Sequence, residues 1–164
     1  MNMSHPRRRQ ALRLLAVSAT AAAAAGALPL ARAQRRPEPT AVEVWKDVNC
    51  GCCHDWIAHM QQHGFQVTAH DGGNNAVRAR LGLPAALGSC HTALIGGYVV
   101  EGHVHADDVR RLLREKPRAL GLAVPGMPIG SPGMDGPAYG GRRDRYDTLL
   151  VQHGGGTQVF RRHA

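Results

Sequence analysis

Aromatic residues are scarce in this chain, at 4% of 164 residues, with two Phe, two Trp and three Tyr. Proteins that bind single-stranded nucleic acid usually stack bases on aromatic rings along a basic groove. Beyond residue 33 the chain has no long basic run, and its 15 Lys and Arg against 12 Asp and Glu give a net charge of about +3. We therefore expect no nucleic-acid partner.

Acidic residues are absent from residues 1–33, and this segment has the three parts of an export signal. It begins with a basic stretch over 7–13 and continues with an alanine-rich apolar stretch over 14–30. It ends in Ala31-Arg32-Ala33, the small-x-small pattern of a signal-peptidase site. We predict that residues 1–33 are an export signal peptide.

The pair Arg8-Arg9 approximates a twin-arginine export signal, and an ordinary secretory signal is the alternative. Gly26 and Pro29 interrupt the short apolar stretch, so we expect no stable membrane insertion after signal cleavage. The prediction is a periplasmic protein in which residues 34–40 form a disordered linker and residues 41–164 form one domain.

Cysteine occurs at four positions, three of them within Asn49-Cys50-Gly51-Cys52-Cys53-His54. Four cysteines in an exported protein usually indicate two disulfides. Here Cys52 and Cys53 are neighbours, and only Cys90 is distant enough to cross-link another segment. The first three lie where a strand pattern gives way to a helix pattern, and a helix N-terminus favours thiolate over thiol. We therefore expect thiolates that bind soft metals or exchange disulfides.

Alternating and helical apolar patterns predict an α/β domain with one open sheet and helices packed on it. Trp56 and Met60 fall on the core-facing stripe of the first helix. A long loop rich in Gly, Pro and Met then leads to a C-terminal hairpin. The patterns predict strands over 41–46, 65–70, 92–95 and 98–101, helices over 52–63, 76–83 and 106–116, a loop from 122 to about 144, and a hairpin over 146–152 and 157–161.

This order of elements, with a C-x-x-C pair where the first helix begins, resembles a thioredoxin-like domain. In that fold the segment that enters the hairpin lies against the cysteine pair and usually carries a cis proline. Here that segment is Ser89-Cys90-His91-Thr92, which has no proline. The resemblance implies that Cys90 lies beside Cys50, Cys52 and Cys53.

Four stretches resemble a more specific family, the CopG-like exported proteins of bacterial copper-resistance systems, long catalogued as a domain of unknown function. The similarity covers about 42–160 and departs from the family only in turns, at 74–75 and 137–143. The resemblance implies copper binding at the cysteines, a thioredoxin-like fold and a role in handling excess copper, by sequestering it or by redox chemistry, with other periplasmic copper-handling proteins as partners. The stretches are Val44 to Cys53, Ser89 to Ala93, Gly97 to Val104 and Gly121 to Met134.

Thiolate is a preferred ligand of copper(I). Because Cys52 and Cys53 are consecutive, their side chains leave the backbone in different directions and do not easily close on one ion. Thiolates that bridge several Cu(I) ions would let Cys50, Cys52, Cys53 and Cys90 hold a multinuclear copper–thiolate cluster.

Four alternatives stay open at this point. Two are a mononuclear Cu(I) site and a zinc-stabilised structural module. The third is a thiol-disulfide oxidoreductase with Cys50 as nucleophile and Cys53 as resolving thiol. The fourth is a copper oxidoreductase that interconverts Cu(I) and Cu(II).

His91, Met127 and Met134 are further candidate copper ligands. His91 adjoins Cys90, and the two methionines place soft thioethers in an irregular loop. Backbone hydrogen bonding by His91 and packing by the methionines are the alternatives, and His54 is a weaker candidate. We expect four other histidines to be solvent-exposed, namely His59, His63, His103 and His105.

Overall fold

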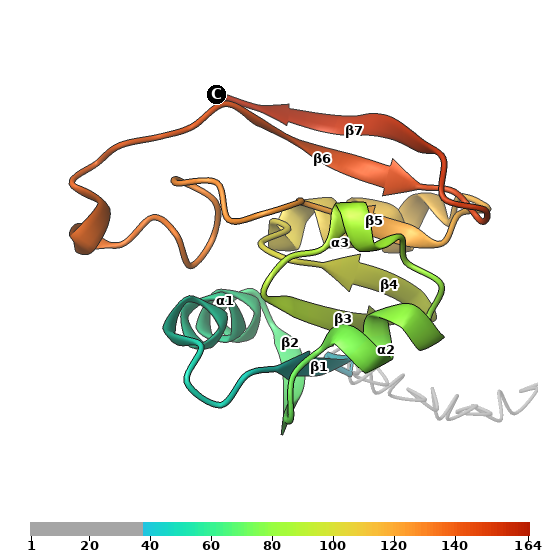
Figure 1. Ribbon diagram of the computed structural model, residues 1–164, viewed down its shortest axis with the longest axis horizontal. Coiled ribbons are helices and arrows are strands. Elements are labelled where there is room, and N and C mark those ends of the chain that lie inside the picture. The colour runs from blue at the N-terminus through green and yellow to red at the C-terminus, as the bar shows by residue number, and fades with distance from the viewer. Residues whose placement is uncertain (1–37) are drawn as a thin grey trace, which may run out of the picture. The chain divides into compact units, whose positions relative to one another are not determined.

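The computed structural model describes residues 38–164, so the predicted export signal and most of the predicted linker lie outside the described residues. The predicted order of elements is confirmed (Figure 1). None of the helices in this part of the chain is long and apolar enough to cross a membrane. The elements are β1 (Thr40–Lys46), α1 (Gly51–Gln62), β2 (Phe65–Asp71), α2 (Asn75–Arg80), η1 (Ala85–Leu87), β3 (His91–Ile95), β4 (Tyr98–Glu101), α3 (Ala106–Glu115), β5 (Gly121–Ala123), η2 (Pro137–Tyr139), β6 (Tyr146–Val151) and β7 (Thr157–His163).

The strands form one mixed sheet of seven strands in the order β2-β1-β3-β4-β5-β6-β7. The β1–β2 and β4–β5 pairs are parallel, and the other neighbours are antiparallel. The predicted α/β open sheet is thus confirmed. It is larger than predicted, because β5 connects the C-terminal hairpin to the strands that carry the cysteines.

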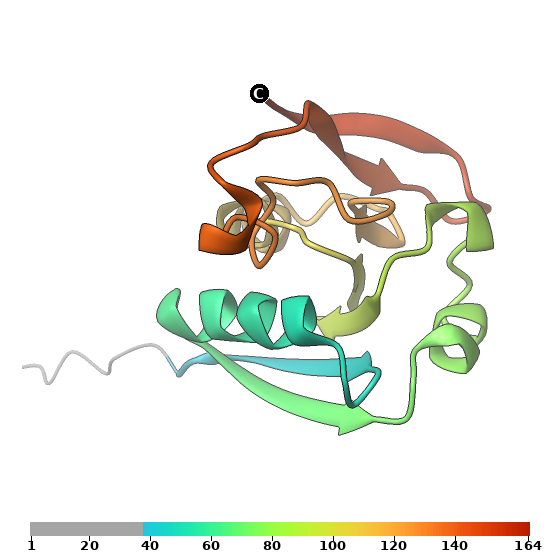
Figure 2. The same ribbon diagram turned by 60° about the vertical axis from the view of Figure 1, so that its left-hand side comes forward.

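Two apolar clusters cover the two faces of the sheet, since successive side chains of a strand point to opposite sides. On one face, α1 and α3 pack Trp56, Met60 and Leu112 against strand residues. On the other, Leu83 lies in a smaller cluster under the segment with α2 and η1. Figure 2 shows α1 and α3 on one side of the sheet and α2 on the other. The core positions predicted for Trp56 and Met60 are confirmed, because both are fully buried.

β5 is the main element that the sequence-based prediction missed. Its residues were assigned in part to the long loop that was expected to begin at residue 122. With only three residues and many Gly and Pro nearby, β5 shows no alternation of its own. It forms because β4 and β6 pair with it on either side.

Smaller differences concern element ends. Thr40 is the first residue of β1 and does not belong to a linker. α2 ends at Arg80, before the predicted end at residue 83, because the chain turns there and lets Leu83 reach the second apolar cluster. The last strand extends to His163.

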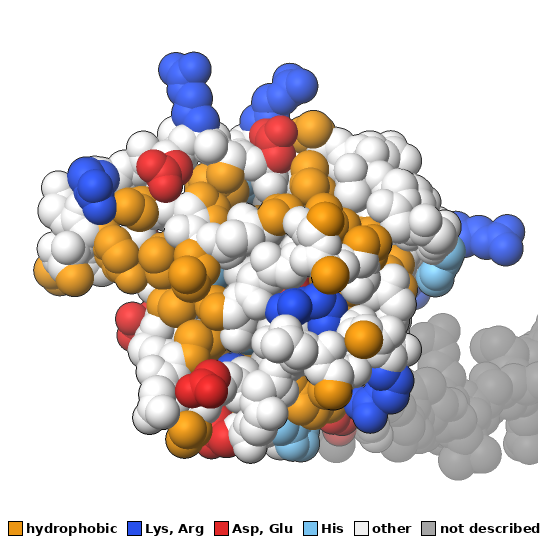
Figure 3. All heavy atoms as spheres, viewed as in Figure 1, with side chains coloured by type: hydrophobic (Ala, Val, Ile, Leu, Met, Phe, Trp, Pro, Cys, Tyr) orange, Lys and Arg blue, Asp and Glu red, His pale blue; other side chains and the backbone are white. Residues whose placement is uncertain are grey.

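The loop between β5 and β6, residues 124–145, lies over α1 in both ribbon views (Figures 1 and 2). Hydrophobic side chains gather where this loop meets α1, while Lys and Arg side chains are scattered over the same face (Figure 3). The loop is therefore a packed part of the domain.

A buried carboxylate joins α3 to the C-terminal hairpin. Asp108, in the first turn of α3, is fully buried. It accepts hydrogen bonds from the Thr148 hydroxyl and the Arg161 guanidinium, both at 2.9 Å, and lies 3.2 Å from His163 Nε2. A buried charge is tolerated only when its hydrogen-bonding capacity is used in this way.

We predict that Asp108→Asn lowers the free energy of unfolding by about 1–3 kcal/mol, because the amide NH2 would face the donors of Thr148 or Arg161 and leave a buried polar group without its partner. Asp107→Asn is the matched control, since Asp107 is the preceding residue of the same helix and its side chain is 70% exposed. Urea denaturation of both variants checks the prediction. Equal losses in the two variants would contradict it.

His59 also differs from expectation, because it is half-buried and caps a helix. Its Nε2 accepts a hydrogen bond from the backbone N–H of Ala106, the first residue of α3, at 3.2 Å. Burial, and then the neighbouring His63 and His105, lower the pKa of His59 to about 4. The neutral imidazole is therefore the form that supports α3.

The pKa of His59 predicts acid sensitivity. Between pH 6.5 and about 4 the unfolded chain takes up a proton at His59 that the folded protein does not, so stability falls as the pH falls. In His59→Gln the amide oxygen of Gln replaces the imidazole Nε2 as the acceptor of the Ala106 N–H, and this amide does not take up a proton in the same pH range. Its free energy of unfolding, measured in urea from pH 7 to pH 4, should decrease less steeply than that of the wild type. Parallel profiles would contradict this assignment.

Candidate metal centre

Three cysteines lie where β1 ends and α1 begins, as predicted. Cys50 is the N-cap residue of α1, and its N–H donates to Asp47 O at 3.1 Å. Its carbonyl accepts the N–H of His54 at 3.3 Å, which starts the helical ladder. Cys52 and Cys53 therefore belong to the first turn of α1.

Cys50 and Cys53 form a disulfide, while Cys52 and Cys90 are free. This differs from the expectation of four free thiolates. The spacing of three residues across a helix start puts Cys50 and Cys53 on the same side, with their Cα atoms 5.3 Å apart, within the usual range for a disulfide. The structure thus describes the oxidised form of the C-x-x-C pair.

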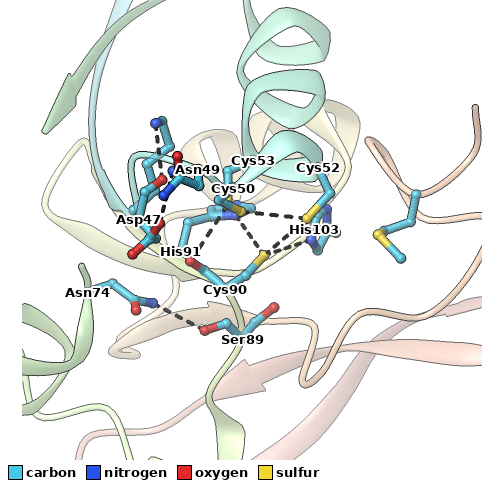
Figure 4. The surroundings of a disulfide bond; sticks show 12 residues. Asp47, Asn49, Cys50, Cys52, Cys53, Asn74, Ser89, Cys90, His91 and His103 are labelled. Atoms are coloured by element: carbon cyan, nitrogen blue, oxygen red, sulfur yellow. Dashed lines mark hydrogen bonds between the residues drawn. A yellow bond between two sulfur atoms is a disulfide. The ribbon is translucent and has the colours of Figure 1, made fainter. Parts of the chain in front are cut away.

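Cys90 lies against this turn even though it comes 37 positions after Cys53 in the sequence. Its Sγ lies 3.7 Å from Cys52 Sγ, which in turn lies 3.6 Å from Cys50 Sγ (Figure 4). The four sulfur atoms are all within 4.8 Å of one another. The proximity that the thioredoxin-like resemblance implied is confirmed by these distances.

His103 is the residue of the site that the sequence-based prediction missed. It was expected to be exposed, but it is fully buried, and its Nε2 lies 3.0 Å from Cys90 Sγ (Figure 4). Its Nδ1 lies 2.8 Å from the carbonyl oxygen of Pro132. Because a carbonyl only accepts, Nδ1 carries the proton and Nε2 directs a lone pair at Cys90.

His91 completes a second group of ligand atoms around Cys90. Its Nδ1 lies 3.5 Å from Cys90 Sγ, and its ring lies 4.4 Å from that of Trp56. His91 Nε2 is the one buried side-chain nitrogen or oxygen within residues 38–164 that has no hydrogen-bond partner. Burial lowers the pKa of His91 well below its usual value and also lowers that of His103. Both imidazoles are therefore neutral, as metal ligands must be.

The surroundings of Cys90 favour the neutral thiol over the thiolate. Burial, followed by the proximity of Cys52, raises the pKa of the Cys90 thiol to about 12. The expected thiolate character depended on a helix N-terminus, and Cys90 precedes a strand instead. The lone pair on His103 is an acceptor already in contact with the Cys90 S–H.

The predicted methionine ligands differ in their exposure. Met134 is 9% exposed, and its Sδ accepts a hydrogen bond from the Tyr139 hydroxyl at 3.2 Å. Met127 is 52% exposed. His54 is exposed on α1.

The expectation of exposed histidines fails for two more residues. His63 and His105 are half-buried. Nδ1 of His63 lies 2.8 Å from the carbonyl oxygen of His59, and Nε2 of His105 lies 2.9 Å from the Tyr146 hydroxyl.

The 124–145 loop forms one wall of the site. A Cβ on Gly133 would lie 2.6 Å from the carbonyl oxygen of Cys52 and 2.8 Å from the backbone nitrogen of Trp56. The preceding residue, Pro132, provides the carbonyl oxygen that accepts a hydrogen bond from His103 Nδ1 and so orients this imidazole. The loop therefore contacts both the cysteine turn and the histidine that faces Cys90.

Two solved structures are similar to this chain over nearly their whole length. One, "Copper resistance protein copG- Form 2", is 47% identical with a TM-score of 0.72, and the match covers 77% of this chain and 100% of that one. The chain belongs to the CopG family. The second, the Form 1 structure of the CopG protein, is also 47% identical, with a TM-score of 0.71 and coverage of 77% and 98%.

A family model described as "Protein of unknown function, DUF411" matches residues 87–134. This part of the CopG-family chain contains Cys90, His91, His103 and both candidate methionines, but not the C-x-C-C turn. No curated protein matches the chain.

We predict that Gly133→Ala lowers the free energy of unfolding by about 2 kcal/mol or more, because φ is +85° at this position and the new Cβ would meet the backbone of α1. Gly136→Ala is the matched control in the same loop, since a Cβ there meets nothing within 4 Å. Thermal unfolding of both variants checks the prediction. A control as unstable as Gly133→Ala would contradict it.

Proposed function

We propose that this protein binds copper as Cu(I) in a cysteine-thiolate cluster and acts in copper resistance in the periplasm. The observation that carries the proposal is the convergence of four sulfur atoms within 4.8 Å of one another. Membership of the CopG family supports the choice of copper, since the similar solved structures are named copper resistance proteins.

The donor set fits copper better than other metals. Thiolates are soft ligands that suit Cu(I), whereas a zinc site closes four ligands around one ion. Cys90 belongs both to the group with three other cysteines and to the group with His91 and His103. A thiolate shared by two ligand groups is suited to bridge metal ions, which supports a multinuclear cluster.

Copper loading at all four sulfurs requires reduction of the Cys50–Cys53 disulfide by an external dithiol, which supplies two electrons and two protons, becomes a disulfide itself and leaves two cysteine thiols. The Cys90 proton, which faces His103 Nε2 in the metal-free protein, must also leave to solvent before Cys90 and His103 can both bind copper. We propose Met134 and Met127 as additional thioether ligands, and cleavage of the export signal after Ala33 before the protein acts.

We predict that the reduced protein takes up more than one equivalent of Cu(I) with loss of free thiols. Cys90→Ser should lower the copper content, because Cys90 is shared by both ligand groups. His54→Gln is the control that should leave it unchanged, since His54 is exposed. Elemental analysis after dialysis gives the stoichiometry, and retention of one zinc ion instead would favour the structural zinc module.

A second candidate function is thiol-disulfide exchange, and the Cys50–Cys53 disulfide favours it. The third thiol weighs against it. Cys52 Sγ lies 3.6 Å from Cys50 Sγ and is in position to attack the Cys50–Cys53 disulfide and exchange it for another pairing. Insulin reduction by metal-free protein that retains no copper would establish this function in place of copper binding. Turnover with Cu(II) as electron acceptor would show that the thiolates and copper act together as a copper oxidoreductase.

A further inference from the structure

The segment that presents Cys90 has no proline to stiffen it, yet the backbone N–H and carbonyl of its first residue, Ser89, are both hydrogen-bonded to side chains. The N–H of Ser89 donates to Glu101 Oε1 at 2.7 Å. The carbonyl of Ser89 accepts from Arg78 Nη2 at 2.6 Å and from Asn74 Nδ2 at 3.2 Å (Figure 4 shows the Asn74 contact). The backbone immediately before Cys90 is therefore fixed by three side chains.

Glu101 is the centre of this network. It is fully buried at the end of β4, and Arg78 Nε donates to its Oε1 at 2.8 Å. Its Oε2 accepts the Thr92 hydroxyl at 2.6 Å. One carboxylate thus holds Ser89 and Thr92, the residues on either side of Cys90-His91. The pKa of Glu101 is raised overall, because burial outweighs the hydrogen bonds from Thr92 and Ser89 and the charge of Arg78, which lower it.

The short helix α2 supplies the other members of the network. Arg78 is on this helix and Asn74 is its N-cap residue, and both donate to the Ser89 carbonyl. Arg78 also donates to the side chain of Asn75 at 2.9 Å, so its guanidinium fork is held in one orientation. The position of α2 is therefore coupled to the position of the Cys90 segment.

Close packing completes the support. A Cβ on Gly102 would lie 2.5 Å from Ser89 Oγ and 2.6 Å from the carbonyl of Val124, and φ at Gly102 is +70°. The N–H of Gly102 donates to the carbonyl of His91 at 3.0 Å. The residue after Glu101 thus lies directly against the Cys90 segment.

We propose that Glu101, Arg78 and Asn74 form a brace that positions the Cys90 sulfur against the cysteine turn. The inference rests on the proposed function in assigning Cys90 to copper binding. A buried ion pair is weak evidence for stability, because apolar residues of similar volume are often as stable. Here the pair aligns the backbone that carries a ligand sulfur, which is the kind of support that a metal site needs.

The chain contains a matched control for this proposal. Asp108 is also a fully buried carboxylate with an arginine and a threonine partner, but it joins α3 to the hairpin. Glu101→Gln and Asp108→Asn each remove one buried negative charge and keep the side-chain size. Only the first should move Cys90.

The test measures the proximity of Cys52 and Cys90 without metal, in protein that carries Cys50→Ser and Cys53→Ser. Glutathione disulfide oxidises the two thiols to a Cys52–Cys90 disulfide and yields two molecules of reduced glutathione. The equilibrium gives the effective concentration of one thiol at the other. We expect Glu101→Gln to lower it about tenfold or more, since displacement of about 1 Å has large effects on such reactions. Asp108→Asn should leave it within about twofold of the parent.

Two milder variants keep the test decisive if Glu101→Gln does not fold. Arg78→Lys keeps the positive charge but cannot donate to Glu101 and to the Ser89 carbonyl at the same time, as the guanidinium does. Asn74→Ala removes one donor to the Ser89 carbonyl. Both variants should lower the effective concentration of Cys52 at Cys90. Unchanged effective concentrations in folded brace variants, or an equal loss in Asp108→Asn, would overturn the proposal. Since no copper is present, the result is independent of the proposed function, which fails separately if the wild type binds no Cu(I).

Discussion

The contact between the sulfurs of Cys52 and Cys90, at 3.7 Å, is the interaction on which the rest of the site depends. It joins the first turn of α1 to the start of β3, and each side has its own support. On the α1 side, Trp56 is fully buried and its indole N–H donates to the carbonyl of Val104 at 2.9 Å. On the β3 side, Glu101 holds the backbone before Cys90. The two halves of the site are thus both held by the segment from Glu101 to Val104.

The metal-free site is almost free of charge, which explains how a cluster of ligands survives inside a folded domain. Cys90 is a thiol, His91 and His103 are neutral, and the Cys50–Cys53 sulfurs are joined in a disulfide. Burying several thiolates together without a cation would be strongly unfavourable. Because burial raises the pKa of Cys90, a metal cation that balances its negative charge favours loss of the Cys90 proton, so metal binding and proton release are coupled there.

The sequence was sufficient for the turn that carries three cysteines, the order of elements and the approach of Cys90. These depend on local patterns or on an order of elements typical of a known fold. His103 and β5 could not be found in this way. Residues 101–104 are all buried, so no alternation marks His103, and β5 exists only through its neighbours in the sheet. Glu101 was the available signal, because a charged residue beside the apolar run Val99-Val100 indicates a buried partner.

At this site a given cysteine can take part in a disulfide or bind copper, but not both at once, because a sulfur in a disulfide is not a thiolate ligand. With the Cys50–Cys53 disulfide in place, only Cys52 and Cys90 are free, together with the two imidazoles that face Cys90. Reduction of this pair would free the other two sulfurs, which lie at the first turn of α1. The oxidation state of this pair therefore sets how many sulfurs the site offers to copper, and the two candidate functions become successive states of one centre.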